Sequence, residues 1–354
     1  MARPPRVSDD TDADAGGRGS GISGIGAPGR TTIIDVAAAA GVSRQTVTRA
    51  VNGMPGISAA TKERVLAAAE ALGYRPSRFG RGLVTGGTHQ LGLVVDDLRN
   101  PYSPALAAAV LGRAAGRGWN VMLADVGLAG DSDRSVQDLG AQSDVVIGHL
   151  GDRAADWISL LGPVPVVELD PVGPTVRGGV RFDPATAVED LADHLVAVGV
   201  DHPVVLDVAD TAGGPSHRGA LVVDALRRRG RPPETVVCTA PSADAGATAL
   251  ADVLAGGRPV DAAVAFNDVV ALGALGACRR AGLDVPGDVR VVGVDGLPLG
   301  ALVAPTLTTL AVDLDEVAGH AIDLALGMLA GSVPRSGPEA QRTVRHRLLV
   351  RESA

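Results

Sequence analysis

The stretch TTIIDVAAAAGVSRQTVTRAVNG, residues 31–53, joins an apolar, alanine-rich first half to a polar second half. Thr32 and Asp35 have the spacing of a capping box, so we expect a helix to begin there and to run to about Ala40. Gly41 then permits a tight turn, because glycine adopts backbone conformations that other residues avoid. The pattern predicts two short helices joined by a glycine turn.

The second of these helices carries the polar side chains. Ser43 is its expected N-cap, the helix covers residues 44–51, and Asn52-Gly53 ends it. Val47 falls on the inward face, which leaves a polar face of Arg44, Gln45, Thr46, Thr48 and Arg49. This arrangement is typical of a helix-turn-helix, whose second helix offers Arg to guanine and Gln to adenine in the major groove. A helix face that is merely solvated remains the alternative.

The charges are distributed unevenly along the chain. Residues 30–86 hold eight basic and three acidic residues, whereas the whole chain of 354 residues has a net charge of −8. Within this basic segment, Ser58 is the expected N-cap of a third helix over residues 59–72, which Gly73 ends. A small basic module joined to a large acidic one predicts a nucleic-acid reader with a separate partner domain.

The chain shows no sign of export or of a metal centre. Residues 1–29 are rich in Gly, Asp, Arg and Ser and lack the apolar segment of a signal peptide, so they predict a disordered tail. No run of about 18 apolar residues occurs, which predicts a cytoplasmic protein without a membrane span. Cys238 and Cys278 are too few for a disulfide framework and lack metal-ligand spacing. We expect no metal and no cofactor.

From Gln90 onward, Val-rich segments alternate with amphipathic segments. The expected strands lie within residues 91–97, 119–126, 143–150, 164–170, 202–210, 234–240, 261–268 and 289–296. Continuous Val-rich runs between helices are typical of parallel sheets that are covered on both faces. Roughly eight such strands exceed one sheet of ordinary size, so the pattern predicts an α/β fold with two successive doubly wound subdomains.

Polar residues stand at the ends of these strands. Ligands of doubly wound sheets bind beyond the carboxyl ends of the strands. The candidates at those ends are Asp96, Asp97, Asn100, Asp170, Asp183, Asp210, Asn267, Asp268 and Asp295. For any single aspartate, the alternative is an ordinary helix N-cap.

Motifs in the basic segment resemble the DNA-binding end of the lactose-repressor (LacI) family. They are Asp-Val-Ala at 35–37, Ala-Gly-Val-Ser at 40–43, Thr-Val-Thr-Arg-Ala-Val-Asn at 46–52 and Leu-Gly-Tyr-Arg-Pro at 72–76. The similarity continues through nearly the whole chain from Thr31. It implies that Arg44, Gln45 and Arg49 read the major groove. The further DNA contacts that it implies are Thr32, Ser43, Thr46, Thr48, Asn52, Ser77, Arg78, Arg81 and Leu83.

The resemblance also makes residues 76–84 a hinge helix that orders on operator DNA, with Leu83 inserted into the minor groove. Gly80 and Gly82 lie within this segment, and each glycine costs a helix up to about 1 kcal/mol relative to alanine. A helix this short is marginal alone. We therefore expect the hinge to be disordered without DNA.

Four motifs in the acidic part resemble effector-binding segments of the same family: DLRNPY (97–102), SHRGALVVDAL (216–226), AFNDVVALGAL (265–275) and VVGVDGLPL (291–299). The resemblance implies that the effector contacts are Tyr102, Asp183, Arg218, Asn267 and Asp295. Their donors and acceptors suit the vicinal hydroxyls of a sugar. Phe182 and Phe266 adjoin two of these positions, and we expect them to pack in the core, with stacking against the ligand as the alternative. Gly296 departs from the family, which has a second aspartate there.

The resemblance implies a domain organisation with these bounds: a tail over 1–29, a helix-turn-helix domain over 30–75, a hinge and linker over 76–88, and an effector-binding and dimerisation domain over 89–354. The last domain is expected to be periplasmic-binding-protein-like and two-lobed. Its first lobe comprises about 89–182 and 311–335, and its second lobe comprises about 183–310 and 336–354.

The predicted function is a sequence-specific DNA-binding transcriptional regulator, a repressor, controlled by a small-molecule effector such as a sugar between the lobes. A homodimer is expected, because operators are read as half-sites and hinge helices pair. A solute-binding protein for a sugar, without a DNA-binding role, is the alternative. An enzyme is not expected, because the chain lacks both the phosphate loop with its Lys-Ser/Thr and the Gly-x-Ser-x-Gly elbow.

Overall fold

The computed structural model describes residues 31–51, 53–74, 89–171, 177–210 and 213–354. The chain divides into two compact units, residues 1–84 and residues 85–354. The predicted N-terminal tail and the predicted hinge over 76–84 lie outside the described residues. Within the described ranges, no helix is long and apolar enough to cross a membrane.

The small unit contains the three helices that the sequence predicts, α1 (Ile33–Ala40), α2 (Arg44–Val51) and α3 (Ala59–Ala71). Asp35 Oδ2 accepts hydrogen bonds from Thr32 N at 2.7 Å and Thr32 Oγ1 at 2.8 Å, which is the expected capping box. Gly41 turns the chain between α1 and α2 with a φ of 63°. The three helices share one core, formed by Val36, Ala37, Ala40, Val47, Ala50, Val65 and Ala69.

The large unit contains two six-stranded sheets, as the expected α/β architecture requires. The first sheet has the order β11 (Gln341–Arg345), β5 (Gly178–Asp183), β4 (Val166–Leu169), β3 (Val145–Gly148), β1 (Gln90–Val95) and β2 (Asn120–Asp125). The second has the order β12 (Arg347–Leu349), β10 (Thr308–Ala311), β9 (Arg290–Asp295), β8 (Ala262–Ala265), β6 (Pro203–Val208) and β7 (Glu234–Cys238). Among these strands only β10 and β12 pair antiparallel.

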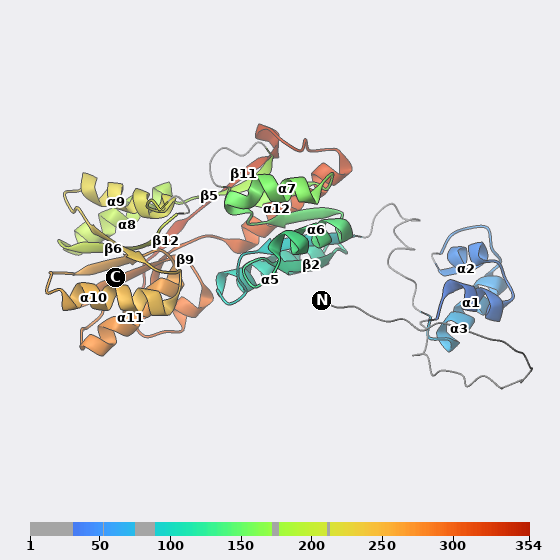
Figure 1. Cartoon of the computed structure of the whole chain (residues 1–354), viewed down its shortest axis with the longest axis horizontal. Coiled ribbons are helices and arrows are strands. Elements are labelled where there is room, and N and C mark those ends of the chain that lie inside the picture. Colours follow the sequence, from blue (N-terminus) through green and yellow to red (C-terminus); the bar gives the residue numbers. More distant parts are fainter. Residues whose placement is uncertain (1–30, 52, 75–88, 172–176, 211–212) are drawn as a thin grey trace, which may run out of the picture. The chain divides into compact units, whose positions relative to one another are not determined.

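Helices cover both faces of each sheet (Figure 1). In the first lobe, α5 (Tyr102–Ala115) and α12 (Leu314–Ala330) cover one face, and α6 (Ser132–Gln142) and α7 (Ala154–Leu161) cover the other. In the second lobe, α8 (Ala185–Ala197) and α9 (His217–Arg228) lie opposite α10 (Ala243–Ala255) and α11 (Asp268–Ala281). Strand β1 is buried throughout because Leu93 packs under α5 and α12 while Val94 packs under α6 and α7.

The lobe boundary near the C-terminus differs from the prediction. The sequence places residues 336–354 in the second lobe, but β11 pairs with β5 of the first sheet, with Val344 opposite Phe182. Only β12 joins the second sheet. The chain therefore passes between the lobes three times: after β5, after β10, and between β11 and β12. Strand β5 is itself absent from the predicted strands, since its first residues are Gly178 and Gly179.

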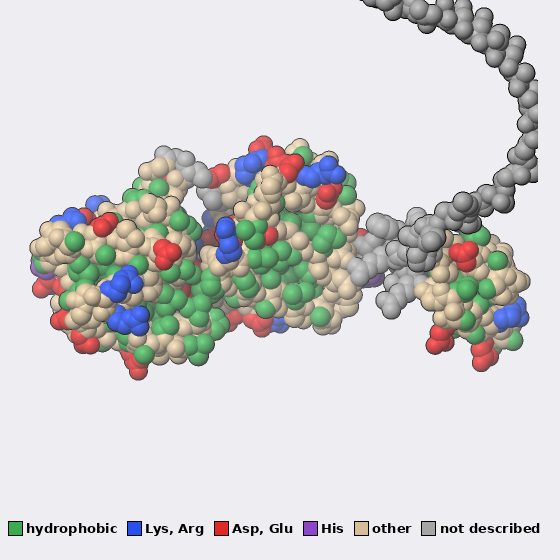
Figure 2. Space-filling view, turned by 60° about the horizontal axis from the view of Figure 1, so that its bottom comes forward, with side chains coloured by type: hydrophobic (Ala, Val, Ile, Leu, Met, Phe, Trp, Pro, Cys, Tyr) green, Lys and Arg blue, Asp and Glu red, His purple; other side chains and the backbone are tan. Residues whose placement is uncertain are grey.

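Hydrophobic side chains also reach the surface of the large unit (Figure 2). The exposed fraction is 84% for Leu302, 60% for Val237 and 50% for Leu111. Leu111 belongs to α5 in the first lobe, and Val237 to β7 in the second. Both lobes therefore have apolar side chains that a second chain could contact.

Candidate functional site

The polar face of α2 points away from the core of the three-helix unit. Ser43 Oγ accepts a hydrogen bond from Thr46 N at 3.2 Å, which starts the helix. Val47 is fully buried, and the helical period then places Arg44 and Gln45 outside, where both are exposed. The helix thus presents to solvent a guanidinium and an amide, the groups that pair bidentately with guanine and adenine.

Hydroxyl groups on α2 are engaged within the helix itself. Thr48 Oγ1 donates to Arg44 O at 3.0 Å, and Ser43 Oγ lies 3.0 Å from Thr46 Oγ1. These bonds fix the start of the helix and the rotamers of its short side chains.

Arg49 is the least exposed of the predicted base-reading residues. It is partly buried, and its Nη1 lies beside Gly56 in the turn after α2. A Cβ added to Gly56 would stand 3.1 Å from that Nη1 atom. The remaining predicted DNA contacts, Asn52, Ser77, Arg78, Arg81 and Leu83, lie outside the described residues.

Two adjoining cavities lie where the strand ends of the two lobes face each other. The interlobe cavity, of about 610 Å³, is lined by residues of both lobes and contains four of the five predicted effector contacts: Tyr102, Arg218, Asn267 and Asp295. The second-lobe cavity, of about 580 Å³, extends from there toward α8 and α9. Six residues line both cavities, namely Asp96, Asp170, Phe182, Arg218, Phe266 and His346.

Arg218 and Asp295 form a charged pair in the interlobe cavity. Arg218 Nη1 lies 3.3 Å from Asp295 Oδ1 and donates to Phe266 O at the same distance, while Arg218 Cζ stands 4.7 Å from the centre of the Phe266 ring. Burial raises the pKa of Asp295 to about 7, the Arg218 charge opposes this rise, and the Asp268 charge adds to it. Asp295 also has a φ of 113°, a strained value for a residue other than glycine.

Asn267 and Asp268 hold the start of α11 against β9 and β10. Asn267 Oδ1 accepts from Val270 N at 2.8 Å, so the side chain is the helix N-cap and keeps its amide NH₂ for a ligand. Asp268 is fully buried and accepts from Thr309 Oγ1 and Leu297 N, both at 2.6 Å. Burial raises the pKa of Asp268 to about 6, and these hydrogen bonds oppose the rise. Asp268 therefore connects α11 to the neighbouring strands and does not line either cavity.

Asp183 is absent from the lining of both cavities, although the sequence predicts it as an effector contact. Its Oδ1 accepts from Ala185 N at 3.0 Å where α8 begins, and its Oδ2 lies 3.9 Å from Arg345 Nε. Asp97 and Asp210 also accept backbone hydrogen bonds within turns. The helix-cap and turn alternatives thus describe several of the strand-end aspartates.

The sequence-based prediction omitted two histidines that line the interlobe cavity, His149 and His346. His149 Nε2 lies 3.2 Å from Tyr102 Oη, and the His149 ring contacts Phe182 edge to face at 5.9 Å. His149 directly follows strand β3, just as Asp96 follows β1. Its position at a strand end therefore identifies it from sequence as a candidate for the cavity lining.

His346 has no comparable signal, because it lies between the last two strands. Its Nδ1 is buried and has no hydrogen-bond partner among the described residues. Burial lowers the pKa of this imidazole and so favours its neutral form. Phe182 packs in the first-lobe core as expected, and it lines both cavities as well.

Both units match families of known proteins. The family model for bacterial regulatory proteins of the lacI family matches residues 32–77, and the model for the periplasmic binding protein-like domain matches residues 192–354. The HTH-type transcriptional regulator reg1 of Streptomyces lividans is 33% identical over 91% of this chain and 96% of its own. The transcriptional repressor CytR of Escherichia coli is 30% identical over 86% of this chain and 92% of its own.

Solved structures show the same similarity. A LacI family transcriptional regulator from Arthrobacter sp. FB24, in complex with lactose, is 37% identical with a TM-score of 0.70 over 75% of this chain and 98% of its own. The lac repressor dimer bound to operator and an anti-inducer is 27% identical with a TM-score of 0.77 over 91% of this chain and 98% of its own. All four of these relatives are transcriptional regulators or repressors.

Proposed function

The chain belongs to the LacI family of bacterial regulatory proteins, and we propose that it represses transcription by binding operator DNA under the control of an effector in the interlobe cavity. One observation carries this proposal. The same chain combines a helix-turn-helix whose Arg44 and Gln45 are exposed with a two-lobed unit whose Arg218–Asp295 pair lines a cavity. We propose Arg44, Gln45 and Arg49 as the base-reading residues.

A sugar is the ligand class that the cavity chemistry and the relatives support. The Arthrobacter relative holds lactose, and a regulator named CelR, 25% identical, holds cellobiose. Sugar hydroxyls both donate and accept hydrogen bonds. Arg218 and Asn267 supply donors, Asp295 supplies an acceptor, and Tyr102 supplies both a ring face and a hydroxyl. We propose these four residues as the effector contacts; Asp183 holds the start of α8 instead.

A homodimer is the proposed working form. The lac repressor relative binds its operator as a dimer, and a symmetric dimer places two recognition helices on two half-sites. The exposed Leu111 and Val237 give each lobe apolar surface for such contacts. We propose residues 76–88 as the hinge and linker between the DNA-binding and effector-binding domains. Because the target is operator DNA, the proposed place of action is the cytoplasm.

The alternative, a sugar-binding protein without a DNA-binding role, has weaker support. It leaves the helix-turn-helix match over residues 32–77 without a purpose.

The test uses the purified full-length chain. Selection from random duplexes, followed by fluorescence anisotropy, should give a preferred site whose affinity falls as salt rises. A thermal-shift screen of mono- and disaccharides should find a sugar that raises the melting temperature, because a ligand of the folded state stabilises it. That sugar should then change the operator affinity. A chain that binds a sugar but no duplex of any sequence would contradict the proposal.

A further inference from the structure

We propose that the effector is a sugar with an amino group, and that the positive charge of this group pairs with Asp96 and Asp170 at the carboxyl ends of the first sheet. This inference rests on the proposed function, because the sugar is taken to bind in the interlobe cavity. It adds the chemical class of that sugar, which the contacts at Arg218 and Asn267 leave open.

The lining of the two cavities is strongly acidic. Among the described residues it includes seven aspartates and two arginines but no lysine and no glutamate, whereas the whole chain has 40 acidic and 32 basic residues. The aspartates are Asp96, Asp97, Asp152, Asp170, Asp207, Asp210 and Asp295, and the arginines are Arg99 and Arg218. A cleft lined by one sign of charge concentrates ligands of the opposite sign.

Both arginines already have a carboxylate beside them. Arg218 Nη1 lies 3.3 Å from Asp295 Oδ1. Arg99 Nε donates to Asp97 Oδ1 at 2.9 Å, and Arg99 Nη2 donates to Asp97 Oδ2 at 2.8 Å. His346 adds no positive charge, because burial lowers the pKa of its imidazole and favours the neutral form. The two arginines therefore leave the other five aspartates without a counter-ion.

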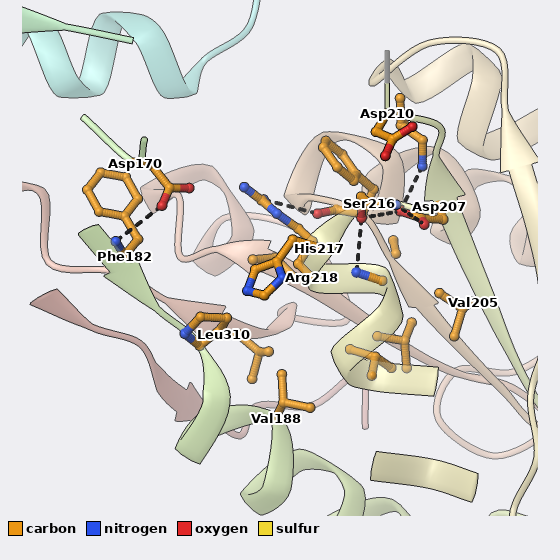
Figure 3. A pocket seen from close by; sticks show the side chains of 18 of the residues that line it. Asp170, Phe182, Val188, Val205, Asp207, Asp210, Ser216, His217, Arg218 and Leu310 are labelled. Carbon is orange, nitrogen blue, oxygen red and sulfur yellow. Dashed lines mark hydrogen bonds between the residues drawn. The ribbon is translucent and has the colours of Figure 1, made fainter. Parts of the chain in front are cut away.

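Three of these five aspartates have local partners or are exposed. Asp207 Oδ1 accepts from Ser216 Oγ at 2.6 Å, and Asp207 Oδ2 accepts from Ser216 N at 2.9 Å (Figure 3). Asp210 Oδ1 accepts from Gly214 N at 2.7 Å. Asp152 is exposed, so water solvates it. None of the three requires a ligand.

Asp96 has no such partner. It directly follows β1 and lines both cavities, and its carboxylate makes no hydrogen bond or salt bridge with any residue that the structure describes. Its side chain is exposed, yet enough protein surrounds it that burial raises its pKa. The His149 charge opposes this rise, and the Asp125 and Asp97 charges add to it. A cation placed beside Asp96 would stabilise its ionised form.

Asp170 supplies a second carboxylate from the same edge of the first sheet. It directly follows β4, and β4 and β1 are the two neighbours of β3. Asp170 Oδ1 accepts from Phe182 N at 3.2 Å (Figure 3). The φ of Asp170 is 45°, a strained value for a residue other than glycine, and such strain is concentrated at ligand sites. Like Asp96, Asp170 lines both cavities.

Tyr102 senses the negative potential of these carboxylates. Burial raises the pKa of its hydroxyl most, the Asp295 and Asp170 charges raise it further, the Arg218 charge opposes them, and the Asp96 charge adds to the rise. At the Tyr102 hydroxyl, three carboxylates thus outweigh one guanidinium. The potential that holds this proton also attracts a cationic ligand.

An ammonium group fits this lining better than a metal ion. Within the described part of the chain, no group of three or more His, Cys, Asp or Glu side chains could hold a metal ion. An ammonium has three donors, so it can bond to one carboxylate and still reach another acceptor. A neutral sugar could donate hydroxyl groups to Asp96 and Asp170, but it would leave both charges uncompensated in the enclosed site.

The test compares sugars that differ at the amino position, on the full-length protein. Isothermal titration near pH 7, where an amine stays largely protonated, measures D-glucosamine, D-galactosamine and chitobiose against D-glucose, D-galactose and cellobiose. At least one amino sugar should bind on the order of tenfold more tightly than its hydroxyl parent, because a charged hydrogen bond is roughly twice as strong as a neutral one. This preference should shrink as salt rises. The N-acetyl forms, which lack the charge, should not show it.

The outcomes separate the amine assignment from the proposed function. Amino sugars that bind no more tightly than their hydroxyl parents, or no more tightly than their N-acetyl forms, would overturn the amine assignment and leave the sugar site intact. If none of these sugars binds, the sugar assignment and the amine assignment both fall.

Two variants locate the charge. D96N removes the charge of this side chain while keeping its size, and should bring the ratio of amine to parent affinity close to one. D323N, the same substitution at a 63% exposed aspartate of α12, is the matched control and should keep the wild-type ratio. D170N should also lower the ratio, a readout that remains if D96N does not fold. A folded D96N or D170N with the wild-type ratio would overturn the proposal.

Discussion

Arg218 Nη1 lies 3.3 Å from Asp295 Oδ1, and this pair joins the first turn of α9 to the end of β9. The exposed side-chain fraction is 29% for Arg218 and 9% for Asp295, so solvent screens the attraction only in part. Removal of one partner leaves the other charge buried without compensation, which is costlier than loss of an exposed pair. The pair lines the interlobe cavity, and the Arg218 charge opposes the rise in the pKa of Asp295 that burial causes.

Replacement of Arg218 should separate the effector response from DNA binding. We expect R218A to lose the change in operator affinity that a sugar produces, while its affinity in the absence of sugar stays within about threefold of wild type. Fluorescence anisotropy with and without sugar measures both. R134A, which removes a 71% exposed arginine, is the control and should respond normally. An R218A protein that still responds to sugar would show that Arg218 is not an effector contact.

Asp295 should make stability depend on pH. Its pKa is raised to about 7 from a usual 3.8, so between those values the folded protein holds a proton that the unfolded chain has released. The stability from this proton is complete below about pH 4 and is lost as pH rises toward 7, by at most about 1.4 kcal/mol per pH unit.

D295N carries no such proton, so its free energy of unfolding should rise relative to wild type between pH 4 and pH 7. Urea denaturation across that range measures the difference, and D315N, at a 66% exposed position, is the control. A D295N difference that stays constant with pH would contradict the raised pKa of Asp295.

Gln45 should discriminate one base position. We expect Q45A to lose about 1–3 kcal/mol of binding free energy at the site with the preferred base there, and much less at sites with another base. Competition among single-base operator variants measures this pattern. E70A, at an exposed residue of α3, is the control. An equal loss at every operator variant would assign Gln45 to the backbone instead.

Two glycines in helices should respond oppositely to alanine. A Cβ at Gly273 would lie 1.9 Å from Ala243 O, so G273A forces α10 and α11 apart and should lose about 1–3 kcal/mol of stability. A Cβ at Gly319, within α12, meets nothing within 4 Å, so G319A should gain about 0.5–1 kcal/mol. Denaturant unfolding compares the two, and a G273A protein as stable as G319A would refute the close packing of α10 on α11.

The predictable part of the fold is the part with a strong periodic pattern. The strands within residues 91–97 and 289–296 are almost entirely buried, and their Val-rich runs identify them from sequence. Strand β11 is different, because it lies at the edge of its sheet and only Val344 of its five residues is buried. An edge strand with so little apolar surface has no pattern to detect. The lobe assignment of residues 336–345 failed for this reason, whereas β12 joins the second sheet as predicted.

The residues that line the cavities are likewise only partly predictable from the sequence. Tyr102, Arg218, Asn267 and Asp295 were found through motifs, and the fold brings their strand and helix ends to one cavity. Asp183 has the same sequence context, yet its carboxylate accepts from Ala185 N at the start of α8, because the side-chain direction at a strand end is set by three-dimensional packing. The second-lobe cavity is lined by residues of several separate elements, and no local pattern in the sequence records where it lies.

His346 is the single residue between β11, which ends at Arg345, and β12, which begins at Arg347. Asp183 pairs with Arg345 and Ala311 pairs with Arg347, so the three crossovers between the lobes lie side by side. Connections this short allow the lobes to rotate about the crossovers but restrict any sliding of one lobe past the other. His346 also lines both cavities, so the proposed effector would bind beside these crossovers. A small rotation about these crossovers would therefore displace the distant edge of a lobe by a much larger distance.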